Sequence, residues 1–334
     1  MSLPRPARAD MARVPAPDYI SARPEEKPAP HDGWDRNVVA RGMIAARRLS
    51  HVRPSATVAM STRARELRRA GRDIIALSAG QPDFPTPVHV CEAAAEAMAR
   101  GETGYTNLTG TPELKSAIAA SFRRTSGLEF AESEIIVSPG GKSVIAATLA
   151  ATLSPGDEVI VPTPCWTSYP DMVRLFGGTP APVAGGADFK ITPEALDAAV
   201  TPRTRWLILN SPGNPTGAVY SANELSALAE VLRRHPHVWV MSDDIYSTVT
   251  FDVPFATLAA VAPDLAPRTL IVSGVSKSYS MTGWRVGWGV GPSERHSPHH
   301  FDRACGKGGH RAHGQEVVRP LGSGCPLGRH RGSH

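Results

Sequence analysis

Residues 273–287 read Ser-Gly-Val-Ser-Lys-Ser-Tyr-Ser-Met-Thr-Gly-Trp-Arg-Val-Gly, so that Lys277 stands among small residues with Arg285 eight positions later. Small residues let a bulky planar ligand approach the backbone. A partly desolvated lysine has a lowered pKa and can act as a nucleophilic amine that forms a Schiff base. An arginine fork binds a phosphate bidentately. Together the two side chains indicate an aldehyde that carries a phosphate, pyridoxal phosphate. Taken alone, the segment would more often be a surface loop.

The order Gly-Val-Ser-Lys-x-x-Ser-Met-x-Gly-x-Arg-Val-Gly around Lys277 resembles the pyridoxal-lysine signature of the class I and II aminotransferases of fold type I. The resemblance implies that Lys277 holds pyridoxal 5′-phosphate as a Schiff base and that Arg285 binds its phosphate. It also implies an α/β fold, in which the large domain is a mainly parallel seven-stranded sheet with helices on both faces.

The residues between Leu49 and Pro292 alternate between patterns typical of strands and of helices. Such alternation is typical of crossover units and predicts a mainly parallel sheet with helices on both faces. Ligands of such sheets bind outside the carboxyl ends of the strands, where the candidate residues fall. We expect strands at 74–77, 134–138, 157–161, 179–183, 205–209, 238–242, 269–273 and 285–290, and helices at 56–70, 87–100, 112–125, 141–153, 167–176, 193–200 and 222–234.

The two ends of the chain differ in composition from its centre. Residues 1–48 are rich in proline, arginine and alanine, which predicts a disordered extension or a start codon placed too far upstream. Residues 49–292 are expected to form the large domain, with 49–80 as an N-terminal arm. Residues 293–334 hold seven of the twelve histidines, and we interpret them as an aberrant or out-of-frame tail of low order. The small C-terminal domain of the family would then be largely absent.

The composition argues against several classes of protein. The net charge of +5 comes from the ends, because residues 49–292 carry 20 Lys and Arg against 22 Asp and Glu. A nucleic-acid-binding fold would place a basic face within its globular part, so no nucleic acid partner is expected. No run of eighteen apolar residues is present, so no membrane span is expected. Scattered cysteines without a CxxC pair favour a cytoplasmic location.

The segment Pro139–Ser143 follows a predicted strand and opens a predicted helix. Glycines there let backbone N–H groups reach a phosphate at the positive end of the helix. The Gly-Lys-Ser triplet is similar to the end of a nucleotide P-loop, but that motif requires a glycine where Ile136 stands. We therefore reject a nucleotide site. In the resembled family this turn binds the cofactor phosphate, which assigns Gly140, Gly141 and Lys142 to it.

Two further motifs follow predicted strands. Trp166 follows the strand 157–161, where an indole can stack on a flat ring, although such a tryptophan is more often part of the core. The segment Asn-Ser-Pro-Gly-Asn-Pro-Thr-Gly at 210–217 is a turn in chemical terms and is similar to the Asn-Pro-Thr-Gly element of the family. By that similarity Trp166 packs on the pyridine face, Asn214 binds the phenolic oxygen of the cofactor, and both residues border the substrate.

The segment Ser-Asp-Asp-Ile-Tyr at 242–246 ends a predicted strand. A carboxylate there could bind a metal, a ribose or a ring nitrogen. Pyridoxal chemistry needs a carboxylate that keeps the pyridine nitrogen protonated. By the family's Asp-x-x-Tyr spacing this is Asp243, and Tyr246 donates to the phenolic oxygen beside Asn214. Asp244 is expected to be solvated or to cap a helix.

The remaining site residues come from the N-terminal part. Gly80, in Ala-Gly-Gln-Pro-Asp-Phe at 79–84, resembles the loop of the family that lies over the substrate. Tyr105 matches the tyrosine that reaches the cofactor phosphate of a partner subunit, which implies a homodimer. Tyrosines in loops are common, so this is the least specific of the assignments.

The chain departs from the family pattern in two places. A serine that helps to bind phosphate in some relatives is replaced by Gly274. The C-terminal arginine that clamps the substrate α-carboxylate has no counterpart, and the arginines of residues 293–334 receive no such role. Three short segments, 55–57, 168–170 and 235–240, are similar to bacterial aspartate aminotransferases of the branch that includes aspartate/prephenate enzymes.

The expected activity is transamination between an L-amino acid, aspartate in the first place, and a 2-oxo acid. Lys277, Asp243 and Tyr246 are the expected catalytic residues. A β-lyase of the same fold type and a truncated, inactive aminotransferase chain remain alternatives. No metal is expected, because Cys305, His310, His313 and Cys325 match the spacing of no zinc module.

Overall fold

The computed structural model describes residues 48–49, 52, 56–77 and 80–292. The chain divides into two units, residues 1–50 and 51–334. In the first unit only Arg48 and Leu49 are described, and both are exposed. The expectations for residues 1–47 and 293–334 lie outside the described residues.

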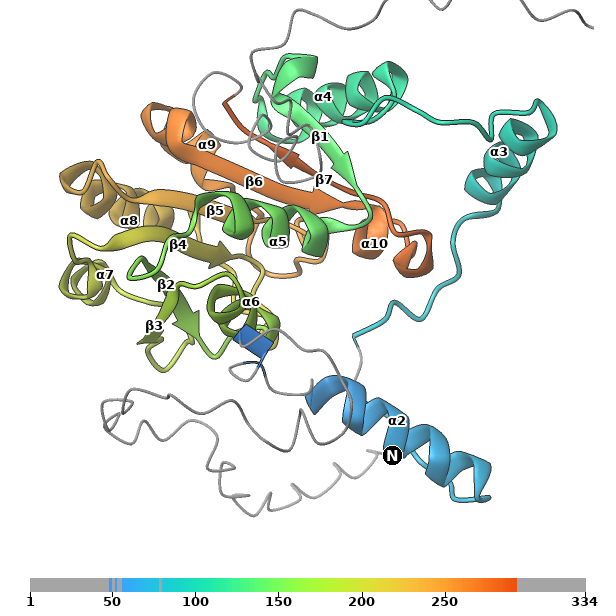
Figure 1. Ribbon diagram of the computed structural model, residues 1–334, viewed down its shortest axis with the longest axis horizontal. Coiled ribbons are helices and arrows are strands. Elements are labelled where there is room, and N and C mark those ends of the chain that lie inside the picture. The colour runs from blue at the N-terminus through green and yellow to red at the C-terminus, as the bar shows by residue number, and fades with distance from the viewer. Residues whose placement is uncertain (1–47, 50–51, 53–55, 78–79, 293–334) are drawn as a thin grey trace, which may run out of the picture. The chain divides into compact units, whose positions relative to one another are not determined.

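A seven-stranded sheet organises the second unit (Figure 1). Six of its strands run parallel, and only β7 is antiparallel to its neighbours β1 and β6. The predicted mainly parallel sheet of seven strands is therefore confirmed. The spatial order is β1-β7-β6-β5-β4-β2-β3. The strands are β1 (Ile135–Ser138), β2 (Glu158–Thr163), β3 (Thr179–Ala184), β4 (Thr204–Asn210), β5 (Trp239–Asp243), β6 (Thr269–Gly274) and β7 (Gly287–Val290).

Helices cover both faces of the sheet because the apolar side chains of its central strands alternate between the two faces. In β4, Leu207 and Leu209 pack with α7, α8 and α9, whereas Trp206 and Ile208 pack with α5 and α6. Figure 1 shows α5 and α6 over one face. The helices are α4 (Pro112–Ser126), α5 (Gly141–Thr152), α6 (Ser168–Leu175), α7 (Pro193–Ala199), α8 (Ala222–Arg234), α9 (Leu258–Val261) and α10 (Val275–Ser278).

Helix α8 shows how local sequence sets an element. Ser221 accepts a hydrogen bond from Glu224 N, and Glu224 accepts one from Ser221 N, which is a capping box. Arg233 and Arg234 stand in the last turn, where positive charge favours the helix dipole. The face toward the sheet is apolar and buried, and it consists of Leu225, Leu228, Ala229, Val231 and Leu232. Capping and amphipathic spacing explain why the predicted bounds 222–234 agree with the structure.

The predicted strand 74–77 is wrong. Residues Ile74–Leu77 form no strand, and the side chains of Ile75 and Leu77 are 84% and 90% exposed. A short β-prone run becomes a strand only where a neighbouring strand satisfies its backbone groups, and none of the described strands pairs with it. The helices on either side, α2 (Ala56–Arg69) and α3 (Val88–Ala99), are as predicted, and α3 buries none of its residues.

The parallel strands bring the predicted site residues to one edge. The strands β1, β2, β4, β5 and β6 end just before the segments that begin at Pro139, Pro164, Ser211, Asp244 and Val275. Within β4 and β5, Asn210 pairs with Asp243, so the ends of these strands are in register. No helix in the described part of the chain is long and apolar enough to span a bilayer.

Candidate active site

A cavity of about 950 Å³ opens at the carboxyl edge of the sheet. Every residue predicted for the site lines this cavity except Gly140 and Tyr105. The predicted residues in its lining are Gly80, Gly141, Lys142, Trp166, Asn214, Asp243, Tyr246, Lys277 and Arg285. Five strand ends, the segment of Gly80 and the segment of Arg285 therefore converge on one space large enough for a cofactor with its substrate.

Lys277 lies in the short helix α10, directly after β6. Its Nζ donates a hydrogen bond to the backbone oxygen of Gly80 and lies 5.7 Å from the ring centroid of Tyr246. Burial lowers the pKa of Lys277 below its ordinary value. A lysine that is more readily deprotonated is a better nucleophile, which is the property that Schiff-base formation requires.

Asp243 is the last residue of β5 and is only 5% exposed. Its Oδ2 accepts a hydrogen bond from the Tyr169 hydroxyl at 2.5 Å, and its Oδ1 accepts one from Ile245 N at 3.3 Å. Burial raises the pKa of Asp243 to about 6, and these two hydrogen bonds oppose the rise. The carboxyl group lines the cavity from its buried end.

Asn214 and Tyr246 are brought together as predicted. Asn214 Nδ2 donates to Tyr246 Oη at 3.1 Å. The loop that carries Asn214 is held by Asn210, whose Oδ1 accepts from Asn214 N at 2.8 Å and whose Nδ2 donates to the backbone oxygen of Asp243 at 2.8 Å. The end of β4 is thereby fixed to the end of β5, and an amide and a phenol face the cavity side by side.

The turn before α5 and the Arg285 guanidinium form one unit. Gly140 has a φ of +87°, and a Cβ there would stand 2.4 Å from Arg285 Nη2. Arg285 itself has a φ of 58°, and its Nη1 donates to Thr282 O at 2.9 Å. A Cβ at Gly287 would stand 2.3 Å from Gly141 N, so β7 also requires a glycine for this approach. Gly140 thus adjoins the site by making room for Arg285.

The replacement of a serine by Gly274 has a steric reason in this chain. A Cβ at position 274 would lie 2.8 Å from Val286 O and 2.9 Å from Gly287 Cα. Both neighbours are backbone atoms, which cannot relieve the clash by a change of rotamer as a side chain can. A serine at this position would therefore require β6 and the segment before β7 to separate.

Lys142 and Trp166 both line the cavity, and their side chains are in contact. Lys142 Nζ lies 4.7 Å from the ring centroid of Trp166, within the range of a cation–π contact. Burial, and then the nearby charge of Arg285, lower the pKa of Lys142. The cavity therefore carries three cationic side chains, those of Lys142, Lys277 and Arg285, which suits an anionic ligand.

Tyr105 does not join this cavity. It lies in the segment between α3 and α4, and its side chain is fully exposed. A tyrosine in this position can serve the site of this same chain only if the segment moves, or the site of another copy if two chains associate.

The expectation that Asp244 is solvated is wrong. Asp244 is 4% exposed, and its Oδ1 accepts a hydrogen bond from Ser242 Oγ at 2.7 Å. Side chains alternate along β5 and into Asp244, which directly follows it, so Asp243 faces α6 whereas Ser242 and Asp244 face the side of α8 and α9. Burial raises the pKa of Asp244 to about 7, and the Ser242 hydrogen bond opposes the rise.

The buried carboxyl of Asp244 makes the stability of the chain depend on pH. An ordinary aspartate pKa is about 3.9, so between pH 4 and 7 the folded chain holds a proton here that the unfolded chain has lost. This contribution to stability is complete below about pH 4 and is lost as pH rises through 7.

The Asp244→Asn variant has no carboxyl at this position and therefore does not lose this stability as the pH rises. We therefore expect the unfolding free energy of the variant to rise relative to that of the original chain between pH 5 and 8, with a slope of up to about 1.4 kcal/mol per pH unit. Urea titrations of both chains at each pH measure the difference, in which the titration of the other groups cancels. A difference that stays constant over this range contradicts the buried, protonated carboxyl.

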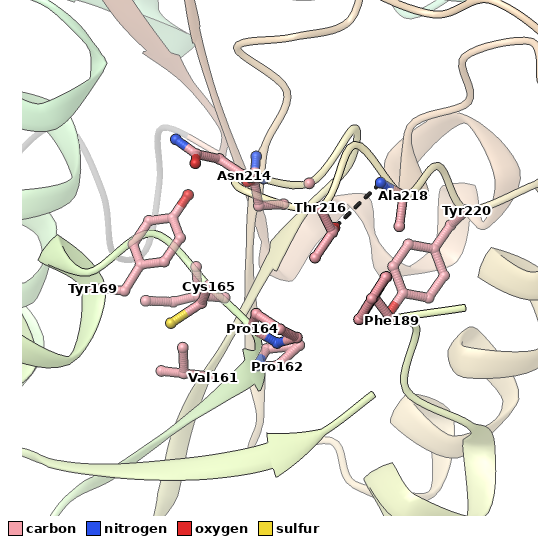
Figure 2. A pocket seen from close by; sticks show the side chains of 13 residues that line it. Val161, Pro162, Pro164, Cys165, Tyr169, Phe189, Asn214, Thr216, Ala218 and Tyr220 are labelled. Atoms are coloured by element: carbon pink, nitrogen blue, oxygen red, sulfur yellow. Dashed lines mark hydrogen bonds between the residues drawn. The ribbon is translucent and has the colours of Figure 1, made fainter. Parts of the chain in front are cut away.

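Tyr169 is a cavity residue that the sequence did not reveal. It is 2% exposed, bonds to Asp243 and lines both the large cavity and a smaller one of about 30 Å³. Figure 2 shows the smaller cavity, with Tyr169, Cys165 and Asn214 on one side and Tyr220 on the other. Its volume is about that of one water molecule. In the sequence Tyr169 stands out only as part of the short segment 168–170, which is similar to bacterial aspartate aminotransferases.

The described residues hold no cluster of three or more His, Cys, Asp and Glu side chains that could bind a metal ion. Cys305, His310, His313 and Cys325 lie outside them. The described cysteines, Cys91 and Cys165, are free thiols, and burial raises the pKa of Cys165 to about 11.

A mainly parallel seven-stranded sheet with a lysine just beyond one strand end and a buried aspartate at the next defines the large domain of a fold type I aminotransferase. Residues 72–307 match the family model of the class I and II aminotransferases, and the chain belongs to this family. The resemblance drawn from the lysine stretch is therefore confirmed.

Two curated bacterial relatives show how similar the chain is to aspartate aminotransferases. The chain is 55% identical over 249 residues to the aspartate/prephenate aminotransferase of Cereibacter sphaeroides, covering 74% of this chain and 62% of that protein. It is 50% identical over 256 residues to the aspartate aminotransferase of Rhizobium meliloti, with coverages of 76% and 62%. The chain thus spans about three fifths of the length of the curated relatives it matches.

Solved structures agree with the fold. The crystal structure of the aspartate aminotransferase from Rhizobium meliloti superposes with a TM-score of 0.73 at 46% identity, over 79% of this chain and 70% of that chain. The aspartate aminotransferase from Thermus thermophilus with maleate gives a TM-score of 0.73 at 44% identity, over 78% and 66%.

Proposed function

We propose that this chain carries the site of a pyridoxal-phosphate-dependent aminotransferase that exchanges an amino group between L-aspartate and a 2-oxo acid. One observation carries the proposal: Lys277, Asp243, the Asn214–Tyr246 pair and Arg285 line a single cavity. The aspartate and aspartate/prephenate aminotransferases among the relatives support the choice of amino donor.

The residues fit pyridoxal phosphate on the evidence of their own geometry. The space that a Cβ at Gly140 would fill is taken by the Arg285 guanidinium, so a glycine turn and a cation meet where a phosphate could bind. The buried carboxyl of Asp243 suits a protonated ring nitrogen, and the Asn214–Tyr246 pair suits a phenolic oxygen. When bound, the cofactor supplies an electron-accepting ring that stabilises negative charge at the substrate Cα.

The chain's own residues then have distinct tasks. Lys277 is the residue that would hold the cofactor through its aldehyde group, and its amine would take and return the proton at the substrate Cα. Asp243 holds the positive charge of the ring nitrogen. Trp166 covers one side of the cavity and excludes water from it. Arg285, with Gly140, Gly141 and Lys142, holds the phosphate.

The proposed activity is tested by incubating the full chain with pyridoxal phosphate, L-aspartate and 2-oxoglutarate and following glutamate formation. Transfer of the amino group from aspartate to the oxo acid supports the proposal. Release of ammonia and pyruvate without amino transfer would indicate a lyase of the same fold type. Absence of both products would overturn the proposed activity for this chain.

We further propose a homodimer in which Tyr105 reaches the phosphate site of the partner subunit. Tyr105 is fully exposed, and two apolar side chains of the same part of the sequence, those of Phe84 and Leu108, are 75% and 65% exposed, which supports an interface on this part of the chain. The scattered cysteines support a cytosolic setting.

The dimer is tested by hybrid complementation. We expect Tyr105→Phe to weaken pyridoxal phosphate binding about tenfold, because a hydrogen bond to a charged group is lost. The Tyr105→Phe variant is then mixed with the Lys277→Ala variant, and the two are unfolded and refolded together. The mixture should be active at a cofactor concentration that leaves Tyr105→Phe alone inactive. Each hybrid has one site with both Lys277 and a partner tyrosine. If co-refolded chains are no more active than chains mixed after folding, Tyr105 does not act across an interface.

A further inference from the structure

We propose that Tyr169 is a positioning residue of this site, whose phenolic hydroxyl holds the carboxylate of Asp243 in place and in its charged form at the buried end of the cavity. The inference rests on the proposed function, because Asp243 matters to catalysis only as the partner of the cofactor's ring nitrogen. The hydrogen bond between Tyr169 and Asp243 that supports the inference forms between residues of the chain and does not involve the cofactor.

The packing of Tyr169 fixes the direction of its hydroxyl. It is the second residue of α6 and meets Trp166 edge to face, with ring centroids 5.2 Å apart and planes at 89°. Its ring belongs to the core cluster between α5, α6 and the sheet. The ring cannot turn without displacing Trp166, so its hydroxyl stays aimed at Asp243 Oδ2, 2.5 Å away.

Asp243 depends on this hydroxyl because it has little other support. Among the described residues, its side chain accepts hydrogen bonds only from Tyr169 and, at the longer distance of 3.3 Å, from Ile245 N. The other ionisable neighbours, Tyr246 and Asp244, add no positive charge. Burial disfavours a carboxylate, whereas a donor bonded to the charged form favours it. Without Tyr169, the carboxyl would keep its proton over a wider pH range.

The proton in the Tyr169–Asp243 bond stays on the phenol. Burial, and then the charge of Asp243, raise the pKa of Tyr169 well above its ordinary value, so the tyrosine is the donor. Cys165 also faces Tyr169, and burial raises the pKa of its thiol to about 11. The cations that line the same cavity come from other elements: Lys142 from α5, Lys277 from α10, and Arg285 from the segment between η4 (Thr282–Trp284) and β7.

Tyr169→Phe tests the inference, and Tyr220→Phe is its matched control. The phenylalanine keeps the ring on Trp166 and removes only the hydroxyl. Tyr220 is also buried, at 4% exposure, and borders the same small cavity (Figure 2), but its hydroxyl accepts from Ile191 N and does not touch Asp243. Both variants therefore lose a buried hydroxyl, and only one loses the donor to Asp243.

The first readout needs no cofactor. In the full chain without pyridoxal phosphate, the infrared carbonyl band of the protonated Asp243 carboxyl is followed against pH and assigned by its loss in Asp243→Asn. We expect its midpoint to move upward by about one to two pH units in Tyr169→Phe and to stay in place in Tyr220→Phe. An unchanged midpoint in folded Tyr169→Phe overturns the inference, and so does an equal shift in the control.

The second readout is turnover of the loaded enzyme. We expect Tyr169→Phe to lower kcat about tenfold with little change in KM, and to shift the acid limb of the kcat profile upward. In the Asp243→Asn background the same change should alter kcat less than about twofold, because its target is gone. An equal effect in both backgrounds overturns the inference. If no amino transfer occurs in any chain but the infrared shift is present, the proposed function fails and the Tyr169–Asp243 link stands.

Discussion

Replacing Lys277 by alanine is expected to abolish covalent attachment of pyridoxal phosphate and to lower turnover by about 10⁴-fold or more. In the proposed function the amine is both the nucleophile that bonds the cofactor and the base that moves the proton at the substrate Cα, so two contributions are lost at once. The structure supports this dual role, because Lys277 lies in the cavity, is partly desolvated and has a lowered pKa.

Borohydride reduction of the loaded protein, followed by trypsin and mass spectrometry, measures the attachment. Trypsin does not cut at a modified lysine, so the label should appear on the peptide 269–285, which ends at Arg285. Lys142→Ala is the control, since it removes the other lysine of the cavity and should leave the label on that peptide. A label elsewhere in the original chain, or a label that persists in Lys277→Ala, would contradict the assignment.

The site residues predicted from the sequence rest on motifs that resemble those of the aminotransferase family, and strand ends explain why these motifs meet. Lys277, Asp243 and Asn214 each stand just beyond an apolar run, and parallel strands bring their carboxyl ends to the same edge. The two-residue period of a strand and the capping residues of helices such as α8 lie within short stretches of sequence. The order of the strands and helices along the chain could therefore be predicted from the sequence.

Features that depend on which helices and strands become neighbours in the fold could not be predicted from the sequence. Tyr169 and Asp243 are separated by 74 positions, and their hydrogen bond exists only because α6 covers the face of β5 to which Asp243 points. The burial of Asp244 requires α8 and α9 to cover the opposite face. The strand predicted at 74–77 had the right composition, but strand pairing is a property of the partner as much as of the segment.

Asp243 and Asp244 are neighbouring residues with similarly buried carboxyl groups, and we expect only one of the two to affect turnover. Asp243 points to the cavity and Asp244 to the opposite side of the sheet, and both are at most 5% exposed. A change from aspartate to asparagine removes an ionisable carboxyl group at either position and preserves the size of the side chain. The effect on turnover therefore depends on which face of β5 carries the carboxyl.

We expect Asp243→Asn to retain covalent attachment at Lys277 and to lower kcat by about 10²–10³-fold or more, because a neutral amide cannot hold the ring nitrogen in its protonated form. Asp244→Asn should keep kcat within about twofold of the original value, since its side chain touches neither the cavity nor the hydrogen bonds of Asp243. Steady-state kinetics with aspartate and 2-oxoglutarate, together with borohydride labelling of each variant, measure both quantities. Equal kcat losses in the two variants would show that turnover responds to the loss of any buried carboxyl group of this strand end. A full kcat in Asp243→Asn would remove the Asp243 carboxylate from the mechanism.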